Sequence, residues 1–367
     1  MRLTCSQKDL LSALVLTGKA VGVNSTLPIL NNVLLKAEGK KLYFTTTNLE
    51  IAISYWIETN VKNEGEITLP SKLFTNYINY LKDDKVDISA EDGNMVILKT
   101  SDSTTKIKGV PASEFPPIPT IEKEAEFSLP VKTLKEAIRH VVFAAAMNTT
   151  RPILSGVCFL VSKNELKMAT TDSYRLAEKT LPLSKTSGDI TCIIPAKTIY
   201  EVGSILDALS GDDLVDVVIS KNQVLFTVGA VKLISRLIEG QFPNYGQIIP
   251  KTNKSQIIFN IQDLILALKR INIFAKENNN KVIFRIKSDA TTLTTDTTQY
   301  GEGEVVLTPK TKGEPNEIAL NSQYLLDALS NIGGEEIQFE VGDKTTPVVI
   351  RPKGKSDYIH IIMPLKI

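Results

Sequence analysis

TLPILNNVLLKAEGKKLYFTTTNLEIAIS, residues 26–54, and TRPILSGVCFLVSKNELKMATTDSYRLAEKT, residues 150–180, are two versions of one segment. Their Thr-Thr steps begin at Thr46 and Thr170, which are 124 residues apart. The same step returns after another 124 residues at Thr294, in LTTDTTQY. Similarity at a fixed spacing along a chain is the sign of an internal repeat. The sequence therefore predicts one structural unit that is present three times.

Two amphipathic segments recur in each copy. The earlier ones are SQKDLLSAL, PVKTLKEAI and NIQDLILAL, and the later ones are ITLPSKLFTNYINYL, CIIPAKTIYEVGSIL and IALNSQYLLDAL. In the earlier set, leucines share one helical position, at Leu10, Leu134 and Leu264. In the later set, a turn precedes each helix, at Pro70, Pro195 and Leu320. Alternating strands surround them, as in KVDISAEDGNMVILKTS. We predict an α+β fold of three repeated domains, each with two helices on antiparallel sheets.

Proline-rich stretches separate the copies. SEFPPIPTIEKEAEF closes the first copy and GQFPNYGQIIPKTNKSQ closes the second. The predicted domains are residues 1–122, 123–253 and 254–367. Each contains about 115–130 residues, which is enough for a core of its own.

Composition narrows the functional class. The 367 residues include 42 Lys and Arg against 41 Asp and Glu, a formal charge of +1, which excludes a polybasic DNA coat and a strongly anionic scaffold. Cys5, Cys158 and Cys192 form no disulfide framework or metal clip and suit a reducing cytosol. The N-terminus is a poor signal peptide, and the longest apolar run, residues 141–147, is too short for a membrane span. These features predict a soluble, intracellular protein.

No catalytic constellation is apparent, and no cofactor or metal site is predicted. His140 and His360 belong to different copies, and no metalloprotease, phosphate-loop or dinucleotide motif is present. Acidic pairs do recur after the second helix of each copy, at Asp83-Asp84, Asp212-Asp213 and Glu335-Glu336. Because all three copies use them alike, turn chemistry explains them better than an active site does. A metal-dependent enzyme acting on nucleic acid stays open as an alternative.

Several blocks resemble a known family. TLPIL near residue 26, RPILSGV from Arg151, TTDSYRLA from Thr170, EGQFPNY from Glu239 and the terminal MPLKI occur in the order and spacing of the bacterial sliding clamp, the beta subunit of the replicative DNA polymerase. The resemblance covers all three copies. It implies a non-enzymatic processivity factor of DNA polymerase III that works in the cytoplasm, associated with the nucleoid at replication forks.

The resemblance also implies partners. Two chains would join head to tail as a homodimer, and the six domains would close a ring around duplex DNA. DNA would then be held by topology, independently of sequence. An apolar pocket would tether the alpha-type replicative polymerase subunit, the clamp loader and other clamp-motif proteins of replication and repair. A triplicated scaffold that binds proteins without DNA is the remaining alternative.

Matching residue by residue, the resemblance assigns the peptide pocket to four segments. The pocket residues are Leu154, Thr171, Ser173, Tyr174, Arg175, Leu176, Pro243, Gln247, Ile248, Asn321, Tyr324, Pro347, Ile361, Ile362, Met363, Pro364 and Leu365. Gln247 replaces a frequent Arg of the family, which suggests an altered peptide preference.

Two further sets follow from the same matching. The residues expected to face DNA are Asn24, Lys72, Asn148, Arg151 and Lys197, and those expected at the dimer interface are Ile107, Ile273 and Phe274. Asn24 stands where a basic residue is common in the family, so Lys72, Asn148 and Lys197 are the stronger DNA-facing candidates. Lysines on helices can meet phosphates without selecting a base sequence.

Overall fold

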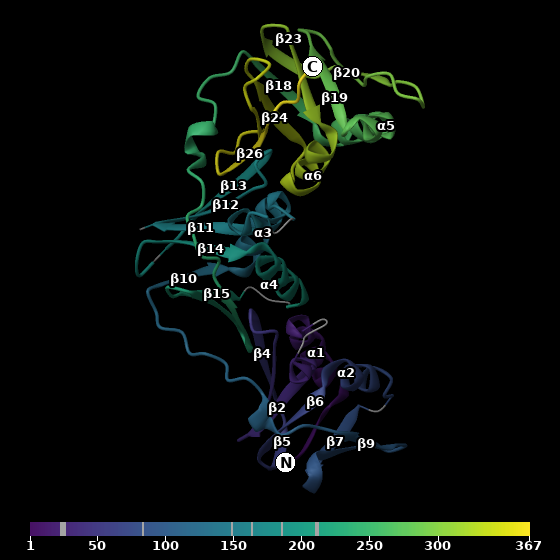
Figure 1. The fold of residues 1–367 in the computed structure, drawn as a ribbon, viewed down its shortest axis with the longest axis vertical. Coiled ribbons are helices and arrows are strands. Elements are labelled where there is room, and N and C mark those ends of the chain that lie inside the picture. Colours follow the sequence, from purple (N-terminus) through teal and green to yellow (C-terminus); the bar gives the residue numbers. More distant parts are fainter. Residues whose placement is uncertain (23–26, 83, 148–149, 163, 185, 210–212) are drawn as a thin grey trace. The chain divides into compact units, whose positions relative to one another are not determined.

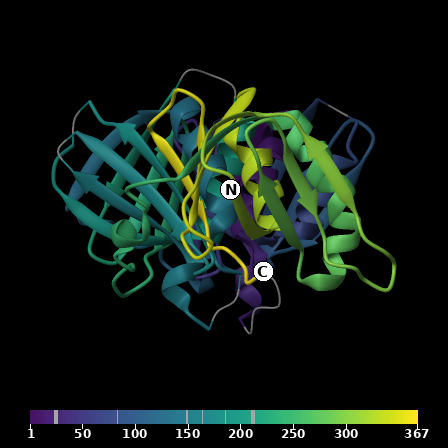
Figure 2. The ribbon, with the colours of Figure 1, turned by 90° about the horizontal axis from the view of Figure 1, so that it is seen from above.

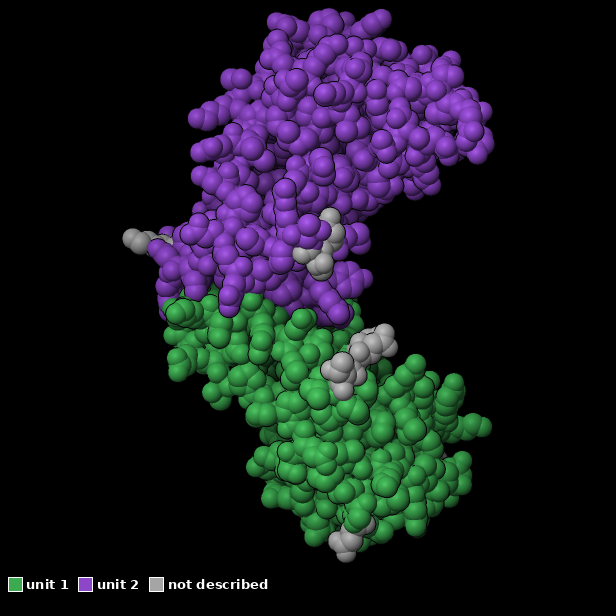
Figure 3. Space-filling model, viewed as in Figure 1, with its two compact units in different colours: residues 1–131, 204–237 green, residues 132–203, 238–367 purple. Residues whose placement is uncertain are grey.

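The computed structural model describes residues 1–22, 27–82, 84–147, 150–162, 164–184, 186–209 and 213–367. These residues form two compact units, coloured separately in Figure 3. The first unit comprises residues 1–131 and 204–237, and the second comprises residues 132–203 and 238–367. No helix in the described ranges is long and apolar enough to cross a membrane.

The first unit has two antiparallel sheets. One has the strand order β5-β1-β7-β8-β9 and the other the order β10-β15-β16-β17-β4-β3-β2-β6 (Figure 1). The elements are β1 (Arg2–Ser6), α1 (Gln7–Thr17), β2 (Asn32–Glu38), β3 (Lys41–Thr47), β4 (Ile51–Glu58), β5 (Asn60–Asn63), β6 (Gly65–Pro70), α2 (Ser71–Asn79), β7 (Lys85–Glu91), β8 (Met95–Lys99), β9 (Thr104–Lys108), β10 (Ala125–Pro130), β15 (Leu214–Ile219), β16 (Gln223–Val228) and β17 (Val231–Arg236).

The second unit repeats this plan. Its sheets have the orders β14-β11-β12-β13-β26-β25-β24-β18-β22 and β21-β20-β19-β23. The elements are α3 (Val131–Val141), β11 (Gly156–Ser162), β12 (Glu165–Thr171), β13 (Arg175–Pro182), β14 (Ile190–Pro195), α4 (Ala196–Ala208), β18 (Ser255–Asn260), α5 (Ile261–Ala275), β19 (Lys281–Ile286), β20 (Thr291–Thr294), β21 (Glu304–Leu307), β22 (Lys310–Gly313), β23 (Asn316–Asn321), α6 (Ser322–Ile332), β24 (Glu336–Val341), β25 (Val348–Pro352) and β26 (Tyr358–Ile362). Helix α3 starts on the last residue of the first unit, and α4 ends inside it.

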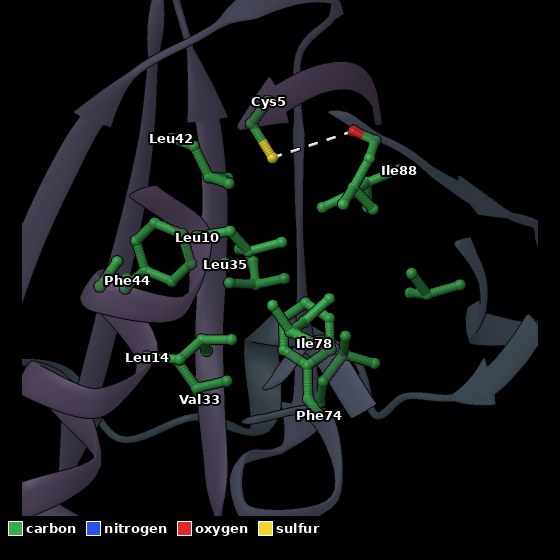
Figure 4. Packing of buried hydrophobic residues seen from close by; sticks show 14 of the residues in the cluster. Cys5, Leu10, Leu14, Val33, Leu35, Leu42, Phe44, Phe74, Ile78 and Ile88 are labelled. Carbon is green, nitrogen blue, oxygen red and sulfur yellow. Dashed lines mark hydrogen bonds between the residues drawn. The ribbon is translucent and has the colours of Figure 1, made fainter. Parts of the chain in front are cut away.

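The core of the first copy shows why the amphipathic segments become helices. Leu10 and Leu14 of α1, and Phe74 of α2, turn toward Leu35 and Phe44 on the neighbouring strands, and all five side chains are fully buried (Figure 4). Burial of one such side chain stabilises the fold by about 1.5–3 kcal/mol. The prediction of two helices on antiparallel sheets in each copy is confirmed by all six helices.

The acidic turns make the same connection in each copy. The carbonyl oxygen in the turn accepts a hydrogen bond from the first backbone N–H of that copy's first helix, at 2.9–3.0 Å in the pairs Asp84 with Gln7, Asp213 with Val131 and Glu335 with Ile261. Such a bond satisfies one of the unpaired donors that every helix start leaves. Asp83 and Asp212 lie outside the described residues. The acidic turns therefore act as structural joints, as the sequence suggested.

Neighbouring copies share their sheets. Strand β17 of the second copy pairs with β4 of the first, and β26 of the third pairs with β13 of the second. The second pairing is visible where teal β13 meets yellow β26 (Figures 1 and 2). The boundaries at residues 122 and 253 stay predictions. Both fall between described strands, just before β10 and β18.

Candidate peptide-binding groove

A turn between β12 and β13 forms one wall of the candidate site. The Thr171 hydroxyl donates to the carbonyl of Arg175 at 2.6 Å and accepts from the N–H of Ser173 at 3.1 Å. The Asp172 carboxylate accepts from the N–H groups of Tyr174 and Arg175 at 2.9 and 3.0 Å. Asp and Thr favour such turns because their short side chains reach the backbone two or three residues on. The wall is therefore fixed by its own hydrogen bonds.

A cavity of about 470 Å³ opens beside this turn. Its floor is apolar, since Leu154 and Leu176 are 6% and 1% exposed. The loop that closes the second copy supplies the opposite wall, including Pro243 and Ile248. An apolar floor with a few polar groups at its edge suits a short extended segment that inserts one or two apolar side chains.

The structure brings only part of the predicted pocket to this cavity. Six predicted residues line it, namely Leu154, Thr171, Ser173, Leu176, Pro243 and Ile248. Six others line it that the sequence reasoning did not place in the pocket, namely Arg151, Pro152, Ile153, Gln241, Asn244 and Tyr245. These residues fall in two segments, one at the short 3-10 helix Pro152–Ser155 and one in the closing loop, and each segment also contains predicted pocket residues. Continuity along these two segments is the signal that could have found them.

Arg151 lies at the edge of the cavity. It lines the cavity, and its guanidinium donates to the Ser173 hydroxyl at 3.5 Å. Arg151 directly precedes the short 3-10 helix Pro152–Ser155. Its expected contact with DNA stays a prediction.

Arg175 lies behind the groove wall. Its guanidinium pairs with Asp172 at 3.0 Å and with Asp327 at 2.6 Å, and it stacks 4.5 Å above the Tyr324 ring. A third bond reaches the carbonyl of Phe143 at 3.0 Å. Because Asp327 and Tyr324 belong to α6, Arg175 ties the groove turn of the second copy to a helix of the third. Burial raises the pKa of the Tyr324 phenol above its usual value.

The C-terminal segment is anchored under the same wall. Ile361 pairs with Leu176 across the β13–β26 ladder, and both Ile361 and Ile362 are buried. After the strand, the N–H of Met363 donates to the carbonyl of Tyr174, and the N–H of Leu365 donates to the carbonyl of Ala319, each at 2.8 Å. The two isoleucines therefore support the groove from beneath, whereas the Met363 side chain is 36% exposed.

Five other predicted pocket residues stand apart from the cavity wall. Asn321 caps α6 by accepting from two backbone N–H groups, and Tyr174, Gln247, Pro347 and Pro364 are exposed or half-buried. None of the five lines the cavity.

Both histidines are buried in the second unit. Burial lowers the pKa of His360 to about 3 and that of His140 to about 4, so both rings are neutral near pH 7. The His140 ring lies 4.9 Å from the Tyr358 ring, and the His360 ring 5.5 Å from that of Phe143. Within the described part of the chain, neither ring nitrogen of His360 has a hydrogen-bond partner. This packing fits a structural role.

The cysteines and the acidic residues form no apparent metal centre. Burial raises the pKa of Cys5, Cys158 and Cys192 to about 12, which keeps them as thiols. Across the described ranges, no group of three or more His, Cys, Asp and Glu side chains is placed to hold a metal ion.

The expected DNA-facing lysines occupy equivalent positions. Lys72 is the second residue of α2 and Lys197 the second residue of α4, and both side chains are exposed. Two further candidates, Asn24 and Asn148, lie outside the described residues.

The dimer candidates behave differently from one another. Ile107 is 6% exposed and belongs to the core of the first copy, because its neighbours Lys106 and Lys108 take the outward face of β9. The expected place of Ile107 at the dimer interface stays a prediction. Ile273 is 69% exposed on α5. Phe274 packs so closely on the 301–303 turn that a Cβ at Gly303 would lie 3.0 Å from its ring.

Comparison with known proteins identifies the fold and the family. Models of the N-terminal, central and C-terminal domains of the DNA polymerase III beta subunit match residues 1–119, 128–244 and 246–366. The "Beta sliding clamp" of Synechocystis is 31% identical over 389 residues and that of Staphylococcus aureus 29% over 376 residues, with 100% of this chain and 99–100% of each relative covered.

Solved structures agree with the family models. The DNA polymerase sliding clamp of Bacillus subtilis aligns with a TM-score of 0.96 at 28% identity over 100% of this chain and 99% of its own. The sliding clamp of Pseudomonas aeruginosa bound to griselimycin gives 0.96 at 27% identity over 100% of both chains. The chain therefore belongs to the family of the DNA polymerase III beta subunit, the non-catalytic bacterial sliding clamp.

Proposed function

We propose that this DNA sliding clamp is a homodimeric ring that encircles duplex DNA and tethers the replicative polymerase through the groove described above. The observation that carries the tethering role is the cavity of about 470 Å³ with its buried leucine floor. The clamp loader and other clamp-motif proteins would use the same groove in turn. The proposed place of action is the cytoplasm, at replication forks.

The groove suits several partners rather than one. Its turn wall is rigid. Met363 does not line the cavity, but its N–H donates to the Tyr174 carbonyl of that wall, and its unbranched, 36% exposed side chain can adjust to different partner side chains. Each apolar anchor that becomes fully buried would contribute about 1.5–3 kcal/mol to binding. We propose that direct contacts come from the cavity residues, and that Arg175, Tyr324, Ile361 and Ile362 hold those residues in place.

Lysines in the first turn of α2 and α4 are proposed to face DNA. Lys72 and Lys197 hold the same position in their copies, so a repeated arrangement would present them to phosphates at regular intervals. A closed ring stays on DNA until it reaches a DNA end, so it does not need strong electrostatic attraction. The formal charge of +1 is compatible with this mode of binding. Asn24 and Asn148 stay proposed DNA-facing residues on the family resemblance alone.

Unpaired sheet edges support the head-to-tail dimer. Strand β9 is the edge of the five-stranded sheet in the first unit, and β21 is the edge of the four-stranded sheet in the second. Near the second edge, Ile273 and Val306 are 69% and 55% exposed. Pairing of β9 with β21 of another protomer would cover both edges and, repeated once, would close the ring.

One experiment separates encirclement from surface binding. The clamp is loaded onto nicked circular DNA by its loader and ATP, and retention is measured before and after the circle is cut. The expected result is release only after cutting. Equal retention on both forms would contradict the ring, and so would equal loss from both.

A second experiment tests the groove. Leu154→Glu places a charge on the apolar floor and is expected to weaken binding of the purified polymerase subunit at least about a hundredfold. The matched control is Leu214→Glu, because Leu214 is 54% exposed on β15 and belongs to the first unit, whereas the groove residues belong to the second. Unchanged affinity of the Leu154 variant, with its fold intact by circular dichroism, would refute the tethering site.

A further inference from the structure

A second cavity, of about 490 Å³, lies on the same sheet as the groove. Leu160 on β11 and Lys167 on β12 face each other across the ladder and line it, together with Glu178 on β13. The closing loop supplies the remaining wall through Phe242 and Ile249. The cavity is therefore built from the outward face of the sheet and from a loop that crosses it.

The loop separates this cavity from the groove. Pro243, Asn244 and Tyr245 line both cavities, so one short piece of chain is the partition between them. The Tyr245 hydroxyl donates to the Glu178 carboxylate at 2.6 Å, which fastens the partition to the sheet. Burial, and then this bond, raise the pKa of the Tyr245 phenol above its usual value. Pro243 and Asn244 are exposed, so a bound chain can cross over them.

The lining indicates what the second cavity accepts. Leu160, Phe242 and Ile249 are half-buried, with apolar surface that nothing in the described chain covers completely. Lys167 stands at the edge, 39% exposed and paired with Glu165 at 3.3 Å. An apolar side chain with an acidic neighbour matches this combination, since the apolar group gains burial and the acid gains a cation.

We propose that the second cavity receives an apolar side chain from the flank of the same partner segment that occupies the groove. The proposal rests on the proposed tethering function and extends it: partners that carry a second apolar residue, a few positions outside the anchor, bind more tightly than partners that carry the anchor alone. Continuity of the two cavities through a shared partition is the observation that selects this occupant over an unrelated ligand.

The test uses the full chain and the purified polymerase subunit as the probe. Leu160→Glu is expected to weaken polymerase binding about tenfold, the share of one buried apolar side chain. Thr191→Trp fills the cavity from its exposed edge and is expected to have a similar effect without touching the core. Leu214→Glu is again the control for an added carboxylate. Circular dichroism of each variant checks that its fold is intact.

The outcomes are distinguishable. Equal polymerase affinity in wild type and in both cavity variants, while Leu154→Glu abolishes binding, would overturn the second cavity and leave the groove intact. If Leu154→Glu has no effect either, the proposed tethering function falls as well.

Discussion

The turn at residues 46–51 in the first copy and the turn at residues 170–175 in the second have one backbone design and unequal cavities. The fourth residue of each, Leu49 and Ser173, has a positive φ of 75° and 81°. In each turn, a Thr hydroxyl donates to the carbonyl four residues on. The side-chain oxygen of the next residue, an Asn or an Asp, accepts from two backbone N–H groups. Yet the cavity beside the first turn measures about 110 Å³, against about 470 Å³ beside the second.

Side chains on this common frame account for the difference. Leu49 puts a large apolar group at the position that Ser173 leaves nearly empty. Residues 116–119, three of which are proline, lie along the first cavity. A positive φ is unusual for a leucine and costs energy, so the first turn keeps its shape because the surrounding bonds impose it. The repeat supplies the scaffold, and the side chain at this position together with the 116–119 segment accounts for the difference in cavity volume.

The largest expected effect separates the two units by pH. Both histidines of the chain are in the second unit, and burial lowers their pKa to about 3 and about 4. As the pH falls, the histidines of the unfolded chain take up protons near pH 6.5, before those of the folded chain do. Their contribution to the free energy of unfolding is therefore complete above that pH and is lost from about pH 6.5 toward pH 4. Together the two groups should cost on the order of a few kcal/mol by pH 4.

Differential thermal unfolding checks this. Trp56, the only tryptophan, lies on β4 and reports the first unit, whereas circular dichroism reports both. On lowering the pH, the dichroism transition should move down more than the Trp56 transition. A variant with both histidines replaced by glutamine should lose the difference, and its persistence in that variant would contradict the assignment.

Removing Arg175 should break the second copy's turn without touching the first. Arg175→Ala leaves Asp172 and Asp327 without their cation and is expected to lower the free energy of unfolding by about 2–3 kcal/mol. The control is Tyr174→Ala, because the neighbouring Tyr174 side chain is 61% exposed. Urea titrations of the three proteins measure the effect. Equal midpoints for wild type and Arg175→Ala would show that the ion pairs contribute nothing.

Exchanging the fourth turn residues, Leu49 and Ser173, tests the comparison directly. Ser173→Leu gives the second turn the side chain of the first and should reduce polymerase affinity about tenfold by filling the groove. Leu49→Ser makes the reverse change and should leave polymerase affinity as it is. Binding of the immobilised polymerase subunit to each variant is the measurement. Loss of binding in the Leu49 variant instead would mean that the partner uses the first cavity.

The smallest effect concerns one threonine in each copy. The hydroxyls of Thr46 and Thr170 donate to carbonyls at the end of their first helices, at Thr17 and Val141. The equivalent hydroxyl of Thr294 is buried, with no partner in the described part of the chain. Replacement by valine should therefore cost about 1 kcal/mol at the first two positions and be neutral or stabilising at Thr294.

Urea unfolding of the three single variants ranks them. A Thr294→Val variant that is destabilised as much as the other two would mean that its hydroxyl has a partner, such as a bound water, after all.

Much of the fold could be predicted from the sequence because the same structural unit recurs in three copies. Period and pattern predicted the six helices, the antiparallel sheets and the turn between β7 and β8, where Gly93 takes a φ of 75°. The sheets that two copies share could not be predicted, because the alternating pattern of β4 or β13 does not indicate which distant strand will pair with it.

The groove was about half predictable. Residues at fixed positions of the turn, such as Thr171 and Ser173, could be matched one by one. Arg151 and Tyr245 could not, because their places depend on how a short 3-10 helix and a closing loop lie over the sheet. Tertiary contacts of this kind leave no periodic trace in the sequence.

The pairing of strands from different copies has a consequence for synthesis on the ribosome, whereas the bond between a helix start and its acidic turn does not delay folding of the first copy. The bond from Gln7 to Asp84 closes within the first copy, so that copy can form its joint early. Strand β4 must wait for β17, whose residues emerge about 180 positions later. At a translation rate of about 5–20 residues per second, the β4 edge stays open for roughly ten to thirty seconds. The nascent chain is thus most exposed to wrong pairing while the second copy is being made, and again at β13 until the last strand, β26, is released.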